Sequence, residues 1–419
     1  MVEWHDLRVD GDRLWQRLEA LGEIGAVHGP NGERGCARLA LTDVDREGRD
    51  LVVSWMRDLG MDVAIDAIGN VVATRAGSDP TAAAVMVGSH IDTVRTGGRF
   101  DGNLGVLAGL EIVETLSQHN LTTRRPIEVA FFTDEEGARF APDMMGSLVY
   151  VGGLAVEEAL DVTAADDGAR LGDELARIGY AGPTPVPAAT FPHAYVELHI
   201  EQGPVLEDEG TTIGVVTGVQ GISWTEVTII GQSAHAGTTP MHLRHDSLAA
   251  AARSIHEVRL IAGSHGAPQV ATVGSLTVVP NLVNVIPSNV VFSIDLRNTD
   301  EPTLKEVEGE VFEACRMYAG DEGCDISMRT LARFEPVEFD EEMIDLVENT
   351  AQRLGHSTRR MPSGAGHDAQ MLARVCPTSM VFVPSVNGLS HNIAEYTTPA
   401  DIEAGANVLL QVVLDRAEG

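Results

Sequence analysis

The chain has 419 residues, of which 44% are hydrophobic and 22% charged, a composition typical of a folded protein large enough for two domains. Its 62 acidic residues outnumber its 29 lysines and arginines, and the formal net charge of -33 argues against a long basic surface for nucleic acid or anionic lipid. No apolar stretch is long enough to span a bilayer, and the first ten residues lack the pattern of a signal peptide, so we expect a cytoplasmic protein.

Two compositional details narrow the chemistry further. Lys305 is the single lysine of the chain, and the other 28 of the 29 lysines and arginines are arginines. Acid excess with almost no lysine suits a salt-rich cytoplasm, because a Debye length of about 3 Å at 1 M salt weakens repulsion between like charges. This halophile hypothesis has an alternative, a GC-rich genome that favours arginine. The four cysteines are scattered without a CxxC pair, so a bound metal would need histidine and carboxylate ligands.

The first region with candidate functional residues lies between Gly88 and Gly105. Residues 82–87 are apolar and predict a buried strand, which is followed by His90 and Asp92. A loop of small residues then carries Asp101, and leucines three apart predict a helix over residues 104–116. Another helix is predicted over residues 46–59. The region is therefore a strand-loop-helix turn with candidate ligands in its loop.

Three later strands also end in histidine or acid. The apolar strand that begins at Ile127 runs into an acidic turn, the alternating segment after Ala194 ends in a histidine and an acid, and the strand at 380–383 precedes a loop with a histidine. In open α/β sheets, ligands bind beyond the carboxyl ends of the strands, so these side chains are expected to converge with the first group. They are Asp134, Glu135, Glu136, His199, Glu201 and His391.

The middle of the chain has a different pattern. From about Ile213 the periodicity predicts strand, helix, strand, strand, helix and strand, the βαββαβ order of a ferredoxin-like unit. We therefore predict an α/β protein in which residues 1–212 and 333–419 form one domain and residues 213–332 form an inserted domain. Residues 161–193 are expected to supply a helix and a loop that cover the first domain.

Each candidate residue also has a structural interpretation. Imidazole and carboxylate groups suit zinc and other first-row divalent ions, although a lone histidine at a strand end is more often a buried structural residue. Asp92 could accept the second N–H of a metal-bound His90, or could be a turn acid. Because adjacent extended residues point to opposite sides, one of Glu135 and Glu136 could bind metal while the other faces reacting water; the alternative is a solvated acidic turn.

At this point several motifs carry a family resemblance. The chain resembles the M20 amidohydrolases, in the branch of N-carbamoyl-L-amino-acid hydrolases, β-ureidopropionases and allantoate amidohydrolases. The motifs cover nearly the whole chain in family order, and HIEQGPVLE and AHAGTTPM are specific to this branch. The matching segments are RLALTDVDREGRD, GSHIDTVRTGGRFDGNLGV, FTDEEGARF, ELHIEQGPVLE, GQSAHAGTTPM, DLRNTD, GAGHDAQ and LSHNIAEYT.

The resemblance implies a fold and a set of residue roles. It implies an M20-type catalytic α/β domain with two divalent metal ions (Zn, Mn, Co or Ni) and an inserted lid that mediates homodimerisation. One ion would be bound by His90 and His199, the other by Glu136 and His391, with Asp101 bridging both. It also implies a cis peptide bond after Asp101. Glu135 would be the general base, and the substrate-binding residues would be Gln202, His235 (which also stabilises the oxyanion), Asn284, Arg297 and His367.

The implied reaction is hydrolysis of a C–N bond other than a peptide bond. The substrate would be a small ureido compound with a carboxylate, and the products an amino acid, ammonia and CO2. Ile222 and Trp224 favour N-carbamoyl-L-amino acids over allantoate, and β-ureidopropionate is a further alternative. Arg297 could instead pair with Asp295 or Asp300. A protein of another class, a metal-free relative that binds a ligand without catalysis, is disfavoured because Glu135 and all five ligand positions are present.

Overall fold

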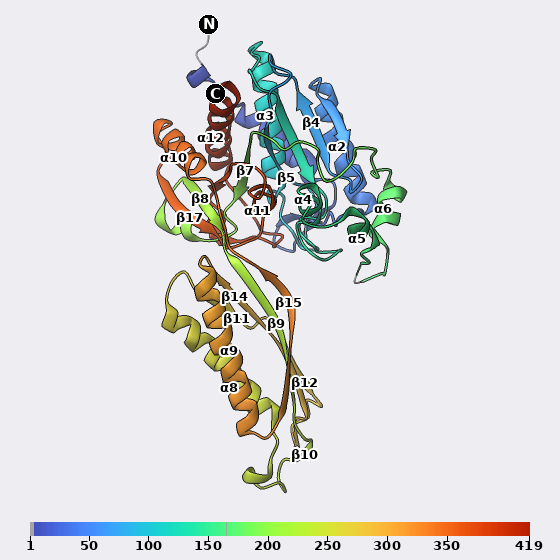
Figure 1. Ribbon diagram of the computed structural model, residues 1–419, viewed down its shortest axis with the longest axis vertical. Coiled ribbons are helices and arrows are strands. Elements are labelled where there is room, and N and C mark those ends of the chain that lie inside the picture. Colours follow the sequence, from blue (N-terminus) through green and yellow to red (C-terminus); the bar gives the residue numbers. More distant parts are fainter. Residues whose placement is uncertain (1–3, 165) are drawn as a thin grey trace. The chain divides into compact units, whose positions relative to one another are not determined.

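The computed structural model of the protein describes residues 4–164 and 166–419. The chain forms two compact units (Figure 1). The first includes the chain up to Gly218 and again from Glu338, and the second is Val219–Val337. The sequence predicts these boundaries near residues 213 and 332, and the catalytic and dimerisation roles of the two units stay predictions. None of the described helices is long and apolar enough to cross a membrane.

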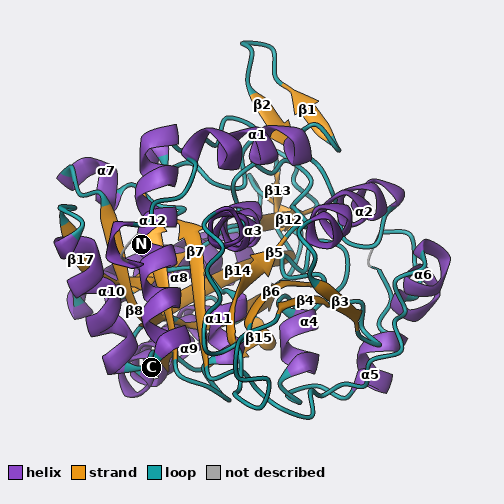
Figure 2. Ribbon diagram, turned by 90° about the horizontal axis from the view of Figure 1, so that it is seen from above, coloured by secondary structure: helices purple, strands orange, loops and turns teal. Residues whose placement is uncertain are grey.

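A mixed sheet of nine strands forms the core of the first unit (Figure 2). The strand order is β16-β8-β18-β7-β5-β6-β4-β3, with β17 beside β8. The central strands β18, β7, β5 and β6 are parallel neighbours, and nearly all their residues are buried, as expected when helices cover both faces. The bounds are Asp62–Ile65 (β3), Val71–Arg75 (β4), Val85–His90 (β5), Ile127–Phe132 (β6), Ala194–Ile200 (β7), Ile213–Val219 (β8), Val337–Glu338 (β16), Thr358–Ser363 (β17) and Thr378–Val383 (β18).

Helices cover both faces of this sheet. Neighbouring residues of β7 show the two faces: the Leu198 side faces α3 (Asn103–Gln118) and α12 (Pro399–Glu418), whereas the Glu197 carboxylate accepts the Ala369 N–H of α11 (Asp368–Leu372). The other elements of this unit are η1 (Trp4–Asp6), α1 (Gly11–Gly22), β1 (Ala26–His28), β2 (Arg34–Cys36), α2 (Asp43–Asp58), α4 (Met145–Tyr150), α5 (Val156–Asp161), α6 (Leu171–Ile178), α7 (Val205–Glu209), α10 (Glu341–Arg353) and η3 (Val386–Gly388).

Two glycines let α3 lie directly on the sheet. A Cβ atom at Gly105 would lie 2.7 Å from the Leu198 carbonyl oxygen, and one at Gly109 would lie 2.7 Å from Val87 Cγ2. Because α3 begins two residues after Asp101, this close approach fixes the height of the Asp101 loop above the ends of β5 and β7.

The second unit has the predicted βαββαβ order. Its sheet follows the order β11-β14-β9-β15, with β12 also paired to β14, so the second predicted strand is divided into two segments. The two long helices pack together against this sheet. The bounds are Gly221–Ile230 (β9), Ala234–His235 (β10), Met241–Leu243 (η2), Ser247–His265 (α8), Val270–Thr272 (β11), Leu276–Val279 (β12), Val285–Ile286 (β13), Asn289–Asn298 (β14), Glu301–Asp321 (α9) and Asp325–Phe334 (β15).

Two local expectations need correction. The strand predicted at 82–87 is β5, which runs three residues later because Gly88 to His90 continue to pair with β6. The cis peptide bond expected after Asp101 is wrong, since the four cis bonds in the described chain all precede proline. Gly102 makes the turn instead, with φ of 65° and ψ of -49°. A Cβ atom there would lie 2.4 Å from the His90 ring, so glycine is also required sterically.

The close approach of α3 to the sheet gives a stability prediction. We expect Gly105→Ala to lower the free energy of unfolding by about 1–3 kcal/mol, because the new methyl group meets main-chain oxygens that have little room to move. Gly309→Ala in α9 is the matched control, since nothing lies within 4 Å of its Cβ position. It should gain up to about 1 kcal/mol from helix propensity. Urea unfolding followed by circular dichroism tests both; a stabilised Gly105→Ala protein would contradict the close approach.

Candidate metal centre and active site

The five side chains predicted to bind metal converge at the carboxyl ends of the central parallel strands. His90 is the last residue of β5, His199 lies near the end of β7, and the other three are on loops. Two groups of three residues form here, and within each group the potential ligand atoms lie within 4.8 Å of one another. Asp101 belongs to both groups. The groups are His90, Asp101 and His199, and Asp101, Glu136 and His391.

The Asp101 carboxylate joins the two groups. Its Oδ1 lies 3.4 Å from His90 Nε2 and 3.1 Å from His199 Nε2, whereas its Oδ2 lies 3.6 Å from His391 Nε2. Burial alone would raise the pKa of this carboxyl, but His199 and His90 hold the pKa well below its usual range. One ionised oxygen therefore faces each group, as in a bridging metal ligand.

The two buried histidines are oriented by main-chain oxygens. His90 Nδ1 lies 2.9 Å from the Asp92 carbonyl oxygen, and His199 Nδ1 lies 2.9 Å from that of Ile200. A ring nitrogen that contacts a carbonyl oxygen must donate, which leaves Nε2 of each ring as the atom available to a metal.

Asp92 supports the site through atoms other than those expected. Its carboxylate lies 3.9 Å from His90 Nδ1, so the predicted carboxylate-histidine hydrogen bond is wrong and the carbonyl oxygen accepts instead. The reason is that the carboxylate turns toward the loop after β6. There it accepts the N–H groups of Glu135 and Glu136, each at 3.3 Å, and orients both acids.

Glu135 and Glu136 face different parts of the cluster, as their adjacency predicts. Glu135 Oε2 lies 3.4 Å from His90 Nε2, and Glu136 Oε2 lies 3.1 Å from His391 Nε2. Burial raises the pKa of Glu135 well above its ordinary value; His90 opposes this rise, and Asp368 and Glu136 add to it. Its burial and its position beside His90 place Glu135 where a general base would be needed.

The donor set fits divalent metal ions. It combines neutral imidazole nitrogens with carboxylate oxygens, the ligands that first-row divalent ions accept. Glu136 Oε1 is buried and has no hydrogen-bond partner among the described residues, so a cation would satisfy it. His391 is about half exposed, and its hydrogen bond with Glu136 raises its pKa to about 9. The second group is therefore open to solvent on the His391 side, where water and substrate can enter.

Two predicted substrate residues also lie at this cluster. Gln202 Nε2 donates to Asp101 Oδ2 at 2.7 Å. The ring of His367 packs edge-on against His199 with 4.5 Å between centroids, and its Nε2 lies 2.9 Å from Ser363 Oγ. Burial, with a smaller contribution from His199, lowers the pKa of His367 well below its ordinary value, so this ring is neutral.

The other three predicted substrate residues belong to the second unit. His235 and Asn284 are exposed neighbours, because the Ala236 N–H donates to the Asn284 carbonyl oxygen at 3.0 Å. Arg297 lies near the opposite end of β14, eight residues beyond Asn289, a distance of about 27 Å along a strand. The second unit therefore does not bring Arg297 together with His235 and Asn284.

Arg297 forms the ion pair that the sequence offered as its structural alternative. Its Nη2 lies 3.0 Å from Asp295 Oδ2, and its guanidinium carbon lies 5.8 Å from the Trp224 ring centroid. The side chain is 23% exposed, so the pair is accessible to a competing carboxylate.

Glu395 is a supporting residue that the sequence analysis missed. Its Oε1 accepts the N–H groups of Phe100 and Asp101, both at 3.1 Å, and its Oε2 accepts the Ser390 hydroxyl at 3.1 Å. Ser390 Oγ also lies 2.9 Å from Asp101 Oδ2, so its single hydroxyl hydrogen is shared between the two carboxyl groups. The one available signal was an acid four residues after His391 in LSHNIAEYT, which does not reveal that this acid turns back to the loop before α3.

Comparisons with known proteins find relatives along nearly the whole chain. Residues 86–415 match the sequence profile described as peptidase family M20/M25/M40. An N-carbamoyl-L-amino-acid amidohydrolase from Rhizobium meliloti is 43% identical and covers 98% of this chain and 97% of its own. An allantoate amidohydrolase from Bacillus subtilis is 34% identical over 93% and 94% of the two chains. A crystal structure of an amidase of the hydantoinase/carbamoylase family from Burkholderia multivorans is 47% identical, with a TM-score of 0.93 over 99% of each chain.

The Glu395 contacts predict an effect on metal affinity. We expect Glu395→Ala to weaken binding of Mn2+ or Zn2+ by about 10- to 100-fold. The loop that presents Asp101 then loses the carboxylate that accepts its main-chain N–H groups. Glu395→Gln retains a carbonyl oxygen for these N–H groups and should stay closer to the unchanged protein. Competition with a chromogenic chelator measures the affinity, and circular dichroism checks the fold. Equal affinity in Glu395→Ala would show that the loop needs no such support.

Proposed function

The chain belongs to peptidase family M20/M25/M40, and on this premise we propose that it hydrolyses the ureido C–N bond of N-carbamoyl-L-amino acids, releasing the amino acid, ammonia and CO2. The observation that carries this proposal is a buried acid, Glu135, beside two groups of metal-ligand atoms that share Asp101. The N-carbamoyl-L-amino-acid amidohydrolase with 43% identity along nearly the whole chain supports this substrate class.

The two groups would hold two divalent ions. One ion would lie between His90, Asp101 and His199, and the second between Asp101, Glu136 and His391. Zn, Mn, Co and Ni all accept these ligands. When bound, such ions make water more acidic and polarise a carbonyl oxygen.

The protein's own residues would then move the protons. Glu135 removes a proton from the water that attacks the ureido carbon, and it gives that proton to the nitrogen that leaves when the C–N bond breaks. Glu135 accepts the proton in its ionised form and returns it from its protonated form, so one carboxyl group serves both steps. Carbamic acid, the remaining fragment, loses CO2 without further catalysis.

Substrate recognition would use the carboxylate of the amino acid. Arg297 can bind a carboxylate through two parallel hydrogen bonds by exchanging Asp295 for the substrate. His235 would stabilise the oxyanion, and Asn284, Gln202 and His367 would bind the remaining polar atoms. The Trp224 ring beside Arg297, together with the buried Ile222, favours an apolar amino-acid side chain over the polar body of allantoate. Allantoate is the second candidate because of the similarity to the Bacillus subtilis enzyme.

The arrangement of the second unit favours a homodimer with shared sites. His235 and Asn284 lie together, and Arg297 lies near the other end of the same sheet, so one substrate cannot touch all three in one chain. We propose that Arg297 serves the site of its own subunit, whereas His235 and Asn284 serve the site of the partner subunit.

One prediction of this proposal concerns the substrate and the general base, Glu135. After chelation and restoration of Mn, Co, Ni or Zn, we expect ammonia release from N-carbamoyl-L-amino acids at rates above those for N-carbamoyl-β-alanine and allantoate. Glu135→Gln should lower kcat by about 10²- to 10⁴-fold while it still binds metal. Glu47→Gln, an exposed residue of α2, is the matched control and should leave kcat unchanged. A folded, metal-loaded protein that releases no ammonia from any of these compounds would exclude ureido hydrolysis.

Another prediction of this proposal concerns the homodimer. His235→Ala and Glu135→Gln should each lose activity alone, whereas dimers that contain one chain of each kind should regain one intact site. Random pairing makes half of the dimers mixed, so a mixture should recover about a quarter of the activity of the unchanged protein. Co-expression with two affinity tags allows the mixed dimer to be purified and assayed. Inactive mixed dimers would mean that His235 acts within its own chain.

A further inference from the structure

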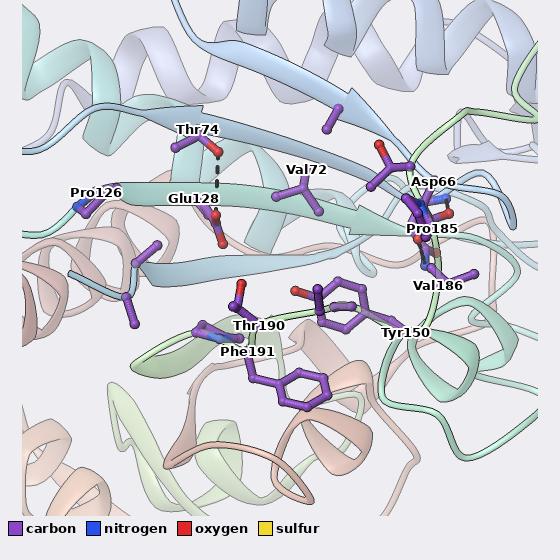
Figure 3. A pocket seen from close by; sticks show the side chains of 18 of the residues that line it. Asp66, Val72, Thr74, Pro126, Glu128, Tyr150, Pro185, Val186, Thr190 and Phe191 are labelled. Atoms are coloured by element: carbon purple, nitrogen blue, oxygen red, sulfur yellow. Dashed lines mark hydrogen bonds between the residues drawn. The ribbon is translucent and has the colours of Figure 1, made fainter. Parts of the chain in front are cut away.

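A cavity of about 650 Å3 lies in the first unit, and its lining includes none of the predicted metal, catalytic or substrate residues (Figure 3). It is bounded by strands β4 and β6, the last residue of α4 and the loop at 184–192. This volume is within the range of pockets that hold small organic molecules.

Most of the lining is apolar. Proline, alanine and valine side chains form much of the walls, and the rings of Tyr150 and of Phe191, near the end of the loop, also contribute. Such a surface packs well against hydrocarbon and offers no hydrogen bonds. The larger apolar residues are Val72, Pro80, Pro126, Pro185, Val186 and Phe191.

Three oxygen-bearing side chains face one region of this space. Figure 3 shows the Glu128 carboxyl group and the Tyr150 and Thr190 hydroxyl groups directed toward the same part of the cavity. Tyr150 is 7% exposed, and its hydroxyl has no hydrogen-bond partner within the described part of the chain. This hydroxyl lines the cavity, where its oxygen can accept a hydrogen bond from a ligand.

The charge of the lining selects the class of ligand. Its two ionisable carboxyl groups are Glu128 and Asp66, and no arginine, lysine or histidine is among the described residues that line the cavity. Asp66 is already bonded to Ile68 and Asn70, whereas Glu128 has one long contact of 3.5 Å with Thr74 Oγ1. Burial raises the pKa of Glu128, which a neighbouring cation would offset. An anion, such as the proposed ureido acid, is disfavoured here.

We propose that this cavity is a second small-molecule site, which binds an organic ammonium ion with an apolar body. A primary ammonium group has three N–H donors, and the cavity offers three acceptors in one region, the Glu128 carboxylate and the Tyr150 and Thr190 hydroxyl oxygens. The apolar body packs against the prolines and Phe191. Alkylamines and arylalkylamines of up to about ten heavy atoms fit this description and this volume.

The site is close in the fold to the catalytic loop. Tyr150 is the last residue of α4, and Met144 at the start of that helix donates its N–H to the Glu135 carbonyl oxygen at 2.7 Å. Asn70, another lining residue, accepts the Thr133 N–H at 2.9 Å and donates to the Gly146 carbonyl oxygen at 2.9 Å. A ligand in the cavity would contact Asn70, which holds the main chain two residues before Glu135, and Tyr150, the last residue of the helix that follows Met144.

Titration calorimetry with 2-phenylethylammonium on the full-length, metal-loaded protein tests the proposal without turnover. One equivalent should bind per chain. The uncharged analogue 2-phenylethanol should bind at least about tenfold more weakly because it lacks the charge-assisted hydrogen bond, and phenylacetate should not bind. No binding of the ammonium ion, or equal binding of the alcohol, would overturn the proposal.

Variants locate the binding. Glu128→Gln has nearly the same shape and should weaken 2-phenylethylammonium binding about tenfold or more, and Tyr150→Phe should weaken it measurably. Glu135→Gln is the matched control, because it changes an acid of the metal cluster to the same amide and should leave the affinity unchanged. Loss of binding in Glu135→Gln with retention in Glu128→Gln would place the amine at the metal cluster and overturn the proposal. If Glu128→Gln proves unstable in a thermal melt, Tyr150→Phe decides.

Discussion

The shared carboxylate of Asp101 is the interaction on which the first unit depends. Three imidazole rings from different parts of the chain lie within 3.6 Å of its two oxygens. Each surrounding feature serves to place that carboxylate: the close packing of α3 on the sheet, the turn at Gly102, and the buried acid Glu395 that accepts the N–H groups of Phe100 and Asp101. Without the Asp101 carboxylate, the two groups of ligand atoms would have no common member.

Buried acids are concentrated around the cluster of candidate metal ligands. Burial raises the pKa values of Asp92, Asp134, Glu135, Glu197 and Asp368, so several carboxyl groups compete for few compensating charges. Divalent ions at the proposed positions would relieve this competition, and metal affinity would then be part of the folding free energy. Asp92 orients Glu135 through its main-chain N–H, whereas burial and the nearby acids Asp368 and Glu136 raise its pKa.

The second unit holds its predicted substrate residues near opposite ends of one long strand. Strand β14 extends from Asn289, near His235 and Asn284, to Arg297 and Asn298 at its other end. A pair of residues that contact opposite ends of a small substrate cannot lie so far apart in one site, so the proposed shared sites follow from strand length. The cavity in the first unit, which is lined by Glu128 and Asp66, differs from the proposed active site in the charge of the ligand that it favours. It attracts cations, whereas the proposed substrate is an anion, so the two sites would not compete for one ligand.

The sequence by itself determined the family, the α/β class and the βαββαβ order of the second unit, because hydrophobic periodicity and motif order are local properties of the chain. It also identified the five candidate ligands, since strand ends in an open α/β sheet must meet at one edge. The tertiary structure decided which atoms make the contacts that hold the site together. It showed that Asp92 holds His90 through its carbonyl oxygen, that Gly102 turns the chain without a cis bond, and that Glu395 returns to the Asp101 loop. These contacts join residues in different loops or in distant segments of the chain. They form only when the chain packs in three dimensions, so no sequence spacing encodes them.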